Sequence, residues 1–168
     1  MTLSMYQASA PVFVRALTNL AGVLKKGEAH AQAKKVEPDA LLQQRLIFDM
    51  LPLVKQVQIA CDMATRGAAR LAGVEPQSFE DNEKTFAEVH ARIDRAIAYI
   101  KTFKPEQIDG SEGRAIHLKM RNGDMDFTGL EYLLGFTLPN LYFHCTTAYD
   151  ILRVAGVEIG KMDYIGTK

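Results

Sequence analysis

Apolar residues recur every three or four positions along most of the chain, which is the period of amphipathic helices. Four such stripes run through residues 13–24, 46–71, 86–100 and 134–155. Each stripe predicts one long helix with a single buried face. Pro52 and Pro139 fall inside the second and fourth stripes, where a proline removes a backbone donor, so we expect a kink or a fresh start near each.

Between the third and fourth stripes, apolar residues recur at every second position instead. Ile116, Leu118 and Met120 alternate with polar residues, and Met125 and Phe127 continue the apolar side. The Asn-Gly pair at 122–123 favours a tight hairpin turn. We therefore expect a hairpin over residues 115–127 whose apolar face packs on the helices. The fold class is predicted to be all-α: an up-down-down-up four-helix bundle with a small β-hairpin between helices 3 and 4, forming one domain over residues 1–168.

Composition and charge exclude several classes of protein. Lysine plus arginine and aspartate plus glutamate each number 20, so the formal net charge is zero and nucleic-acid binding, which needs a basic surface, is not expected. No apolar run approaches the roughly 18 residues of a membrane span. Cys61 and Cys145 form no metal or redox motif, and both lie on helical stripes. We expect them to be reduced and buried, in a cytoplasmic protein.

The stretch NLYFHCTTAY, residues 140–149, places a histidine within an apolar stripe. His144 lies about 70° from the centre of that stripe, and Asn140 shares this margin. On the second predicted helix Asp49 lies about 80° from the stripe centre, with Gln56 near the same line. Facing helices of a bundle build internal sites from such residues. We predict that these four line a small ligand-binding pocket, with His144 hydrogen-bonded to a neighbour such as Asp49.

A metal site is the alternative for His144. A tight site requires at least three protein ligands, and Ala148 occupies the position one helical turn after His144. His90 lies about 55° from the centre of the third stripe and could converge with His144 across the bundle. No metal or other cofactor is expected. If a divalent ion such as zinc or nickel does bind, the predicted ligands are His144, Asp49 and His90.

Three stretches together resemble an uncharacterised bacterial family of the DinB/YfiT-like superfamily of putative metalloenzymes: SMYQASAPVFVRALTNL, DMLPLVKQVQIACD and TLPNLYFHCTTAYDILRVAGV. The resemblance covers almost the whole chain. It implies an up-down-down-up four-helix bundle, commonly dimeric. Many superfamily members bind a divalent metal through three histidines, one from the second helix and an HxxxH pair on the last. His144 matches the first of that pair, Ala148 stands at the second, and residues 38–72 contain no histidine.

Two hypotheses follow. The first is a DinB-like protein with a degenerate metal site that binds a small molecule or acts structurally as a dimer. The second is a metal-dependent enzyme, of the thiol transferase or hydrolase type, with a site rebuilt around Asp49 and His144. The apolar tail VEIGKMDYIGTK is expected to lie over the bundle or a partner subunit, and it also motivates a predicted homodimer.

Overall fold

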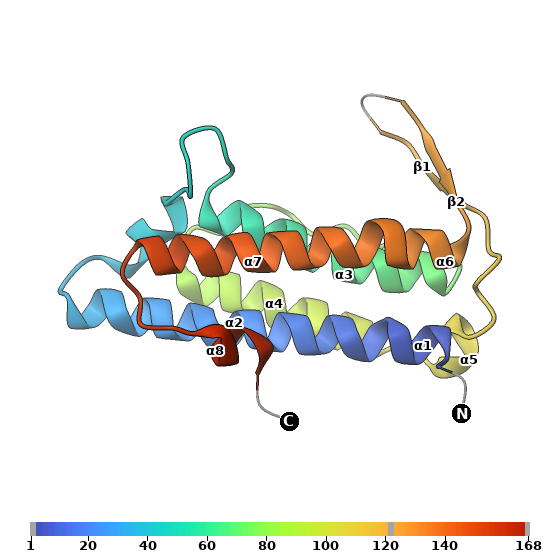
Figure 1. The fold of residues 1–168 in the computed structure, drawn as a ribbon, viewed down its shortest axis with the longest axis horizontal. Helices are drawn as coiled ribbons and strands as arrows, with labels where there is room; N and C mark the ends of the chain where they lie inside the picture. Colours follow the sequence, from blue (N-terminus) through green and yellow to red (C-terminus); the bar gives the residue numbers. More distant parts are fainter. Residues whose placement is uncertain (1–2, 121–122, 167–168) are drawn as a thin grey trace.

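The computed structural model describes residues 3–120 and 123–166, and they are mostly helical. Four long helices lie side by side along the long axis of the molecule (Figure 1): α2 (Ala10–Ala33), α3 (Leu53–Leu71), α4 (Phe86–Ile100) and α7 (Leu138–Val154). The short elements are α1 (Met5–Ala8), the 3-10 helix η1 (Pro38–Gln43), α5 (Pro105–Ile108), α6 (Gly129–Glu131), the π-helical segment η2 (Tyr132–Thr137) and α8 (Lys161–Ile165). Within the described ranges, no helix has the length and hydropathy to cross a bilayer.

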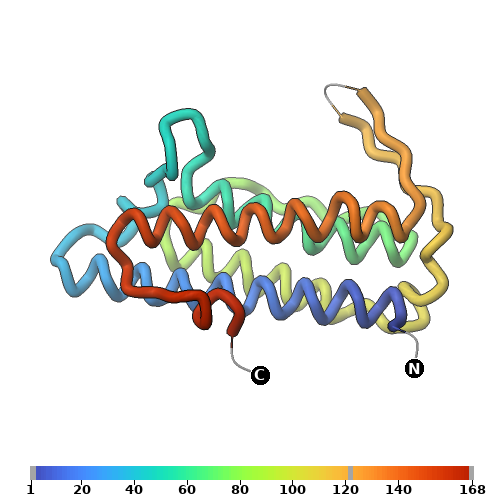
Figure 2. The backbone as a smooth tube through the Cα atoms, in the orientation of Figure 1, coloured from blue at the N-terminus to red at the C-terminus, as the bar shows by residue number. Residues whose placement is uncertain are grey.

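The packing of the long helices brings together segments that are distant in sequence. α3 and α2 each pack against both α4 and α7, and the most extensive contact joins α3 to α7. α3 and α4 begin at the same end of the molecule, while α2 and α7 begin at the opposite end (Figure 2). Residues 72–85 therefore return along the length of the helices without forming a helix or strand of their own.

The core consists largely of the predicted stripes. Its fully buried members come from all four long helices and include Phe13, Leu17, Leu24, Val57, Ala64, Ala68, Ile93, Ile100, Leu141, Ala148 and Leu152. Burying one such side chain contributes about 1.5–3 kcal/mol relative to leaving it exposed. The apolar periodicity therefore identified the faces that hold the fold together.

Two parts of the predicted stripes are wrong, each near a proline. α3 begins at Leu53 with Pro52 as its N-cap, so residues 44–52 form a loop and Leu46 and Met50 are not on the helix. Before Pro139 the chain forms the π-helical segment η2, whose wider turns shift the buried face. Leu133 and Thr137 are buried there, and the predicted core residue Leu134 is exposed.

The hairpin is present and small. β1 (Ile116–Leu118) pairs antiparallel with β2 (Met125–Phe127), with Ile116 opposite Phe127 and Leu118 opposite Met125. Ile116 and Leu118 are buried, and Phe127 packs on Tyr132 and Phe136. Met125 is exposed, so the predicted packing of the hairpin is wrong for this residue, and Met120 beyond β1 is exposed as well. Asn122 of the predicted turn lies outside the described residues.

A buried arginine ties three segments together. The Arg92 side chain on α4 is 0% exposed, and its guanidinium lies 2.8 Å from an Asp62 oxygen on α3. It also lies 3.0 Å from Asp81 and 3.1 Å from Glu83, and it donates to the Glu80 carbonyl at 2.9 Å. Asp81, Glu83 and Glu80 all belong to the returning segment 72–85. Removing one partner of a buried ion pair costs about 3–5 kcal/mol, because the remaining charge loses its compensation.

Arg92→Leu is expected to lower the free energy of unfolding by about 3–5 kcal/mol, since Glu83 and Asp62 would lose their buried cation. Arg95 on the same helix is a matched control: it also pairs with Glu83, at 3.6 Å, but its side chain is 59% exposed. Arg95→Leu should change stability by less than about 1 kcal/mol. Urea denaturation of both variants measures this, and equal losses would contradict the assigned role of Arg92.

Candidate functional site

His144 lies between α7 and α3, and its partner is Gln56. The His144 Nδ1 atom is 2.7 Å from Gln56 Oε1. Gln56 is buried, and its amide nitrogen donates to the Leu51 carbonyl at 2.9 Å, which leaves its oxygen free to accept. The bond therefore places a proton on Nδ1 of His144. Burial lowers the pKa of His144, which favours the neutral ring with a lone pair on Nε2.

The other predicted pocket residues do not join this pair. Asp49 is exposed in the loop before α3 rather than on the helix, so the predicted hydrogen bond from His144 to Asp49 is replaced by the bond to Gln56. Asn140 donates to the Phe136 carbonyl of the preceding segment η2 at 2.7 Å. His90 faces α2, where its Nε2 atom lies 3.6 Å from Glu28. Sequence reasoning placed Gln56 and His144 near each other but named Asp49 as the partner of His144, where the structure has Gln56.

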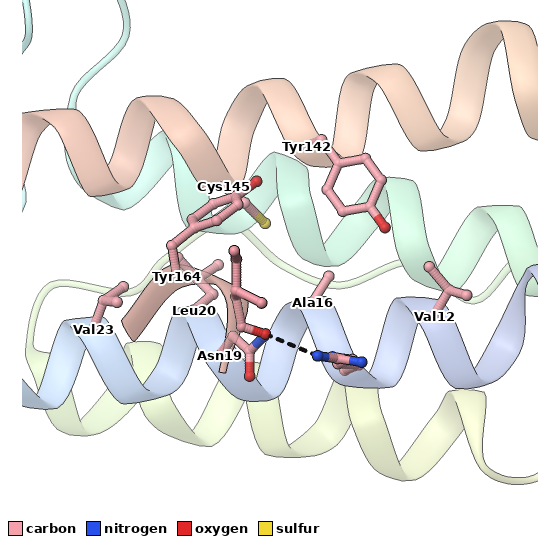
Figure 3. A pocket seen from close by; sticks show the side chains of 10 residues that line it. Val12, Ala16, Asn19, Leu20, Val23, Tyr142, Cys145 and Tyr164 are labelled. Carbon is pink, nitrogen blue, oxygen red and sulfur yellow. Dashed lines mark hydrogen bonds between the residues drawn. The ribbon is translucent and has the colours of Figure 1, made fainter. Parts of the chain in front are cut away.

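A cavity of about 320 Å³ lies on the other side of α7, between α7, α2 and α8 (Figure 3). Its walls are mainly apolar, with polar groups from a few side chains. The lining residues are Val12, Arg15, Ala16, Asn19, Leu20, Val23, Tyr142, Cys145, Tyr164 and Ile165. Figure 3 shows the Tyr142 ring extending from α7 toward α2. The volume is at the lower end of the range of small-molecule sites.

The C-terminal segment covers this cavity. The Ile165 carbonyl accepts hydrogen bonds from Asn19 at 2.7 Å and from Arg15 at 3.2 Å. The Tyr164 hydroxyl accepts from Thr146 on α7 at 3.0 Å, and Ile159 is buried in the core. The tail thus packs on its own chain, one of the two locations expected from its apolar residues. Sequence reasoning missed the cavity, because α2 and α7 are distant in sequence and no motif marks their contact.

The two cysteines are buried and free of disulfides, as predicted. Burial raises the pKa of Cys61 and of Cys145 to about 12. The thiolate, which is the nucleophilic form, is therefore negligible at neutral pH. Cys145 contributes to the cavity wall as a small apolar group rather than as a nucleophile.

Comparison with known proteins identifies the family. The model of a domain of unknown function, DUF1993, matches residues 5–165. The chain belongs to the DUF1993 family. A crystal structure of a DinB family member from Shewanella denitrificans is similar over 97% of this chain and 92% of its own, with 40% identity and a TM-score of 0.88. No curated protein matches the chain. The resemblance noted from the sequence is thereby confirmed.

The three-histidine metal site common in the DinB superfamily does not fit the residues of this DUF1993 protein. Beside His144, the facing helix α3 offers the Gln56 amide, and the next turn of α7 offers Ala148, which has no donor atom. Within residues 3–120 and 123–166, no three His, Cys, Asp or Glu side chains gather in a way that could hold a metal ion. The alternative set His144, Asp49 and His90 is not brought together. The Gln56–His144 pair offers one imidazole lone pair, on Nε2 of His144, at the margin of the core.

His144→Ala is expected to lower the free energy of unfolding by about 1–3 kcal/mol, because Gln56 Oε1 would remain buried without a donor. The loss should be the same with and without a chelator, and the metal content of the purified protein should not change. A double variant, His144→Phe with Gln56→Leu, should recover part of the loss, since both polar groups are then removed. A stoichiometric metal that disappears in His144→Ala would contradict this role.

Proposed function

We propose that this DUF1993 protein is an up-down-down-up four-helix bundle that binds a small, largely apolar organic molecule in the cavity between α2, α7 and α8. The observation that carries the proposal is the cavity itself, whose walls come from two core helices and a covering segment. A concave, mainly apolar surface with a few polar groups is the common form of a small-molecule site. The Gln56–His144 pair, by contrast, satisfies itself and supports a structural role.

The cavity is placed where a ligand could enter without unfolding the core. α8 is a short helix of five residues, joined to α2 through Arg15, Asn19 and Lys26. Opening it breaks a few exposed hydrogen bonds, each of which contributes only about 1 kcal/mol. The four long helices can remain packed while the segment moves.

Octanamide, a neutral probe with an eight-carbon chain, is expected to bind with a Kd on the order of 1 mM, given roughly 0.4 kcal/mol per heavy atom. Amide NMR shifts should change around the lining residues. Ala16→Phe, which fills the cavity, should abolish binding. Ala29→Phe is the matched control, because Ala29 is exposed on the same helix and does not line the cavity. Equal binding to both variants, or shifts centred on Gln56, would refute the cavity as the site.

A second component of the proposal is a homodimer, favoured by one exposed apolar surface. Phe48 is 87% exposed and Phe143 56% exposed, and Ile47 and Leu51 are exposed with them. Contacts run from Phe143 through His144 and Gln56 to Leu51, which supports the grouping of these exposed side chains on one face. The four side chains offer on the order of 400 Å² of apolar surface, about half of the roughly 800 Å² that each partner buries in a stable interface. A second copy of the chain, covering the same surface, fits a symmetric interface.

Light scattering at micromolar concentration is expected to give twice the monomer mass. Phe48→Asp should shift the mass to that of the monomer, because it places a charge at the centre of the apolar surface. Val154→Asp is the control, since Val154 is exposed at the end of α7. A monomer mass for the unmodified chain would rule out the dimer without affecting the proposed cavity site.

A further inference from the structure

We propose that the ligand of the cavity is a small carboxylic acid with an apolar body, whose carboxylate is held by Arg15 and Tyr142. This inference rests on the proposed function, that the cavity binds a small molecule. It adds the chemical class of the ligand and the residues that determine it.

The charge of the side chains that line the cavity favours an anionic ligand. Among the described residues lining the cavity, the exposed Arg15 carries a full charge and none is a carboxylate. A ligand cation would be repelled by Arg15 and would find no counter-charge there. A neutral ligand would leave the guanidinium to water, whereas an anion gains a charge-assisted hydrogen bond.

The donors near this charge suit a carboxylate. One terminal nitrogen of Arg15 donates to the Ile165 carbonyl, and the guanidinium has five N–H donors in a planar fork that matches a carboxylate. Burial raises the pKa of the Tyr142 phenol, with Arg15 acting weakly in the opposite direction. The phenol therefore remains protonated at neutral pH and can donate as well. Both side chains border the same cavity from opposite helices, α2 and α7.

The rest of the wall suits an apolar body. Val12, Ala16, Leu20 and Val23 follow one another along α2 and present aliphatic surface. A cavity of 150 Å³ holds benzene, so about 320 Å³ accommodates roughly an eight-carbon chain or two rings. A sugar carries several hydroxyls, and those that met the aliphatic part of the wall would lose their partners, at a cost of about 1–3 kcal/mol for each buried group. A phosphate ester carries up to two charges, and one arginine does not balance them.

Three probes with the same chain and different head groups test the proposal at pH 7: octanoate, octanamide and octylammonium. NMR titration should give octanoate a Kd about fivefold to tenfold lower than octanamide, and octylammonium the weakest binding. Arg15→Gln should remove the preference for octanoate, because it lowers the affinity for octanoate more than the affinity for octanamide. Arg15→Lys should keep part of the preference. Lys25→Gln, which removes an exposed charge of the same helix outside the cavity, should leave all three affinities unchanged.

The outcomes separate the two proposals. If none of the probes shifts the resonances of the cavity, or if Ala16→Phe binds them all as well as the unmodified chain does, the proposed function fails. If octanamide binds in the cavity but octanoate binds no more tightly, only the acid is refuted. An equal loss of octanoate affinity in Arg15→Gln and Lys25→Gln would also refute it, because the effect would then be one of net charge.

Discussion

The buried Arg92 is the constraint on which the arrangement of the helices depends. A guanidinium at 0% exposure is tolerated only with counter-charges, and the chain supplies them from α3 and from the returning segment 72–85. That segment has no ladder or helix of its own, and the ion pairs of Arg92 with Asp81 and Glu83, together with bonds from Lys55 and Gln58 of α3 to the same carboxylates, hold it against the helices. By joining the segment to α3 and α4 at once, Arg92 allows two consecutive helices to run in the same direction.

Once α3 is fixed in this way, it sets the position of α7, which packs against it. One face of α7 then meets α3, and another face meets α2 at the cavity. Adjacent residues on a helix differ by about 100°, so His144 can face α3 while Tyr142 and Cys145 face α2. The rotation of α7 about its axis is set by the π-helical segment that precedes it and by Pro139 in its first turn. One extra residue in that turn exposes Leu134 and places Thr137 in the core. The same shift determines which side of α7 meets the cavity.

Features that depend on local periodicity could be predicted from the sequence. Features that depend on contacts between residues distant in the sequence could not. The four stripes, apart from their parts near Pro52 and Pro139, and the position of the hairpin follow from spacing alone. Asp49 was misplaced because apolar spacing continued across Pro52, where the helix in fact begins. The ion pairs of Arg92 could not be predicted from the sequence, because Asp81 and Glu83 lie in a segment without apolar periodicity. The Gln56–His144 bond was within reach because both residues lie on the margins of regular helices.

The two faces of α7 differ in how completely they are filled, and this difference decides where a ligand would bind. Between α7 and α3, Gln56 and His144 satisfy each other and Ala148 is fully buried, so a guest molecule would have to displace a formed hydrogen bond. Between α7 and α2, the small side chains Ala16 and Cys145 leave space that α8 covers without filling. An unfilled apolar space forfeits dispersion contacts that a ligand can restore. Binding on the α2 side therefore gains packing energy at little polar cost, whereas binding on the α3 side would lose a buried hydrogen bond.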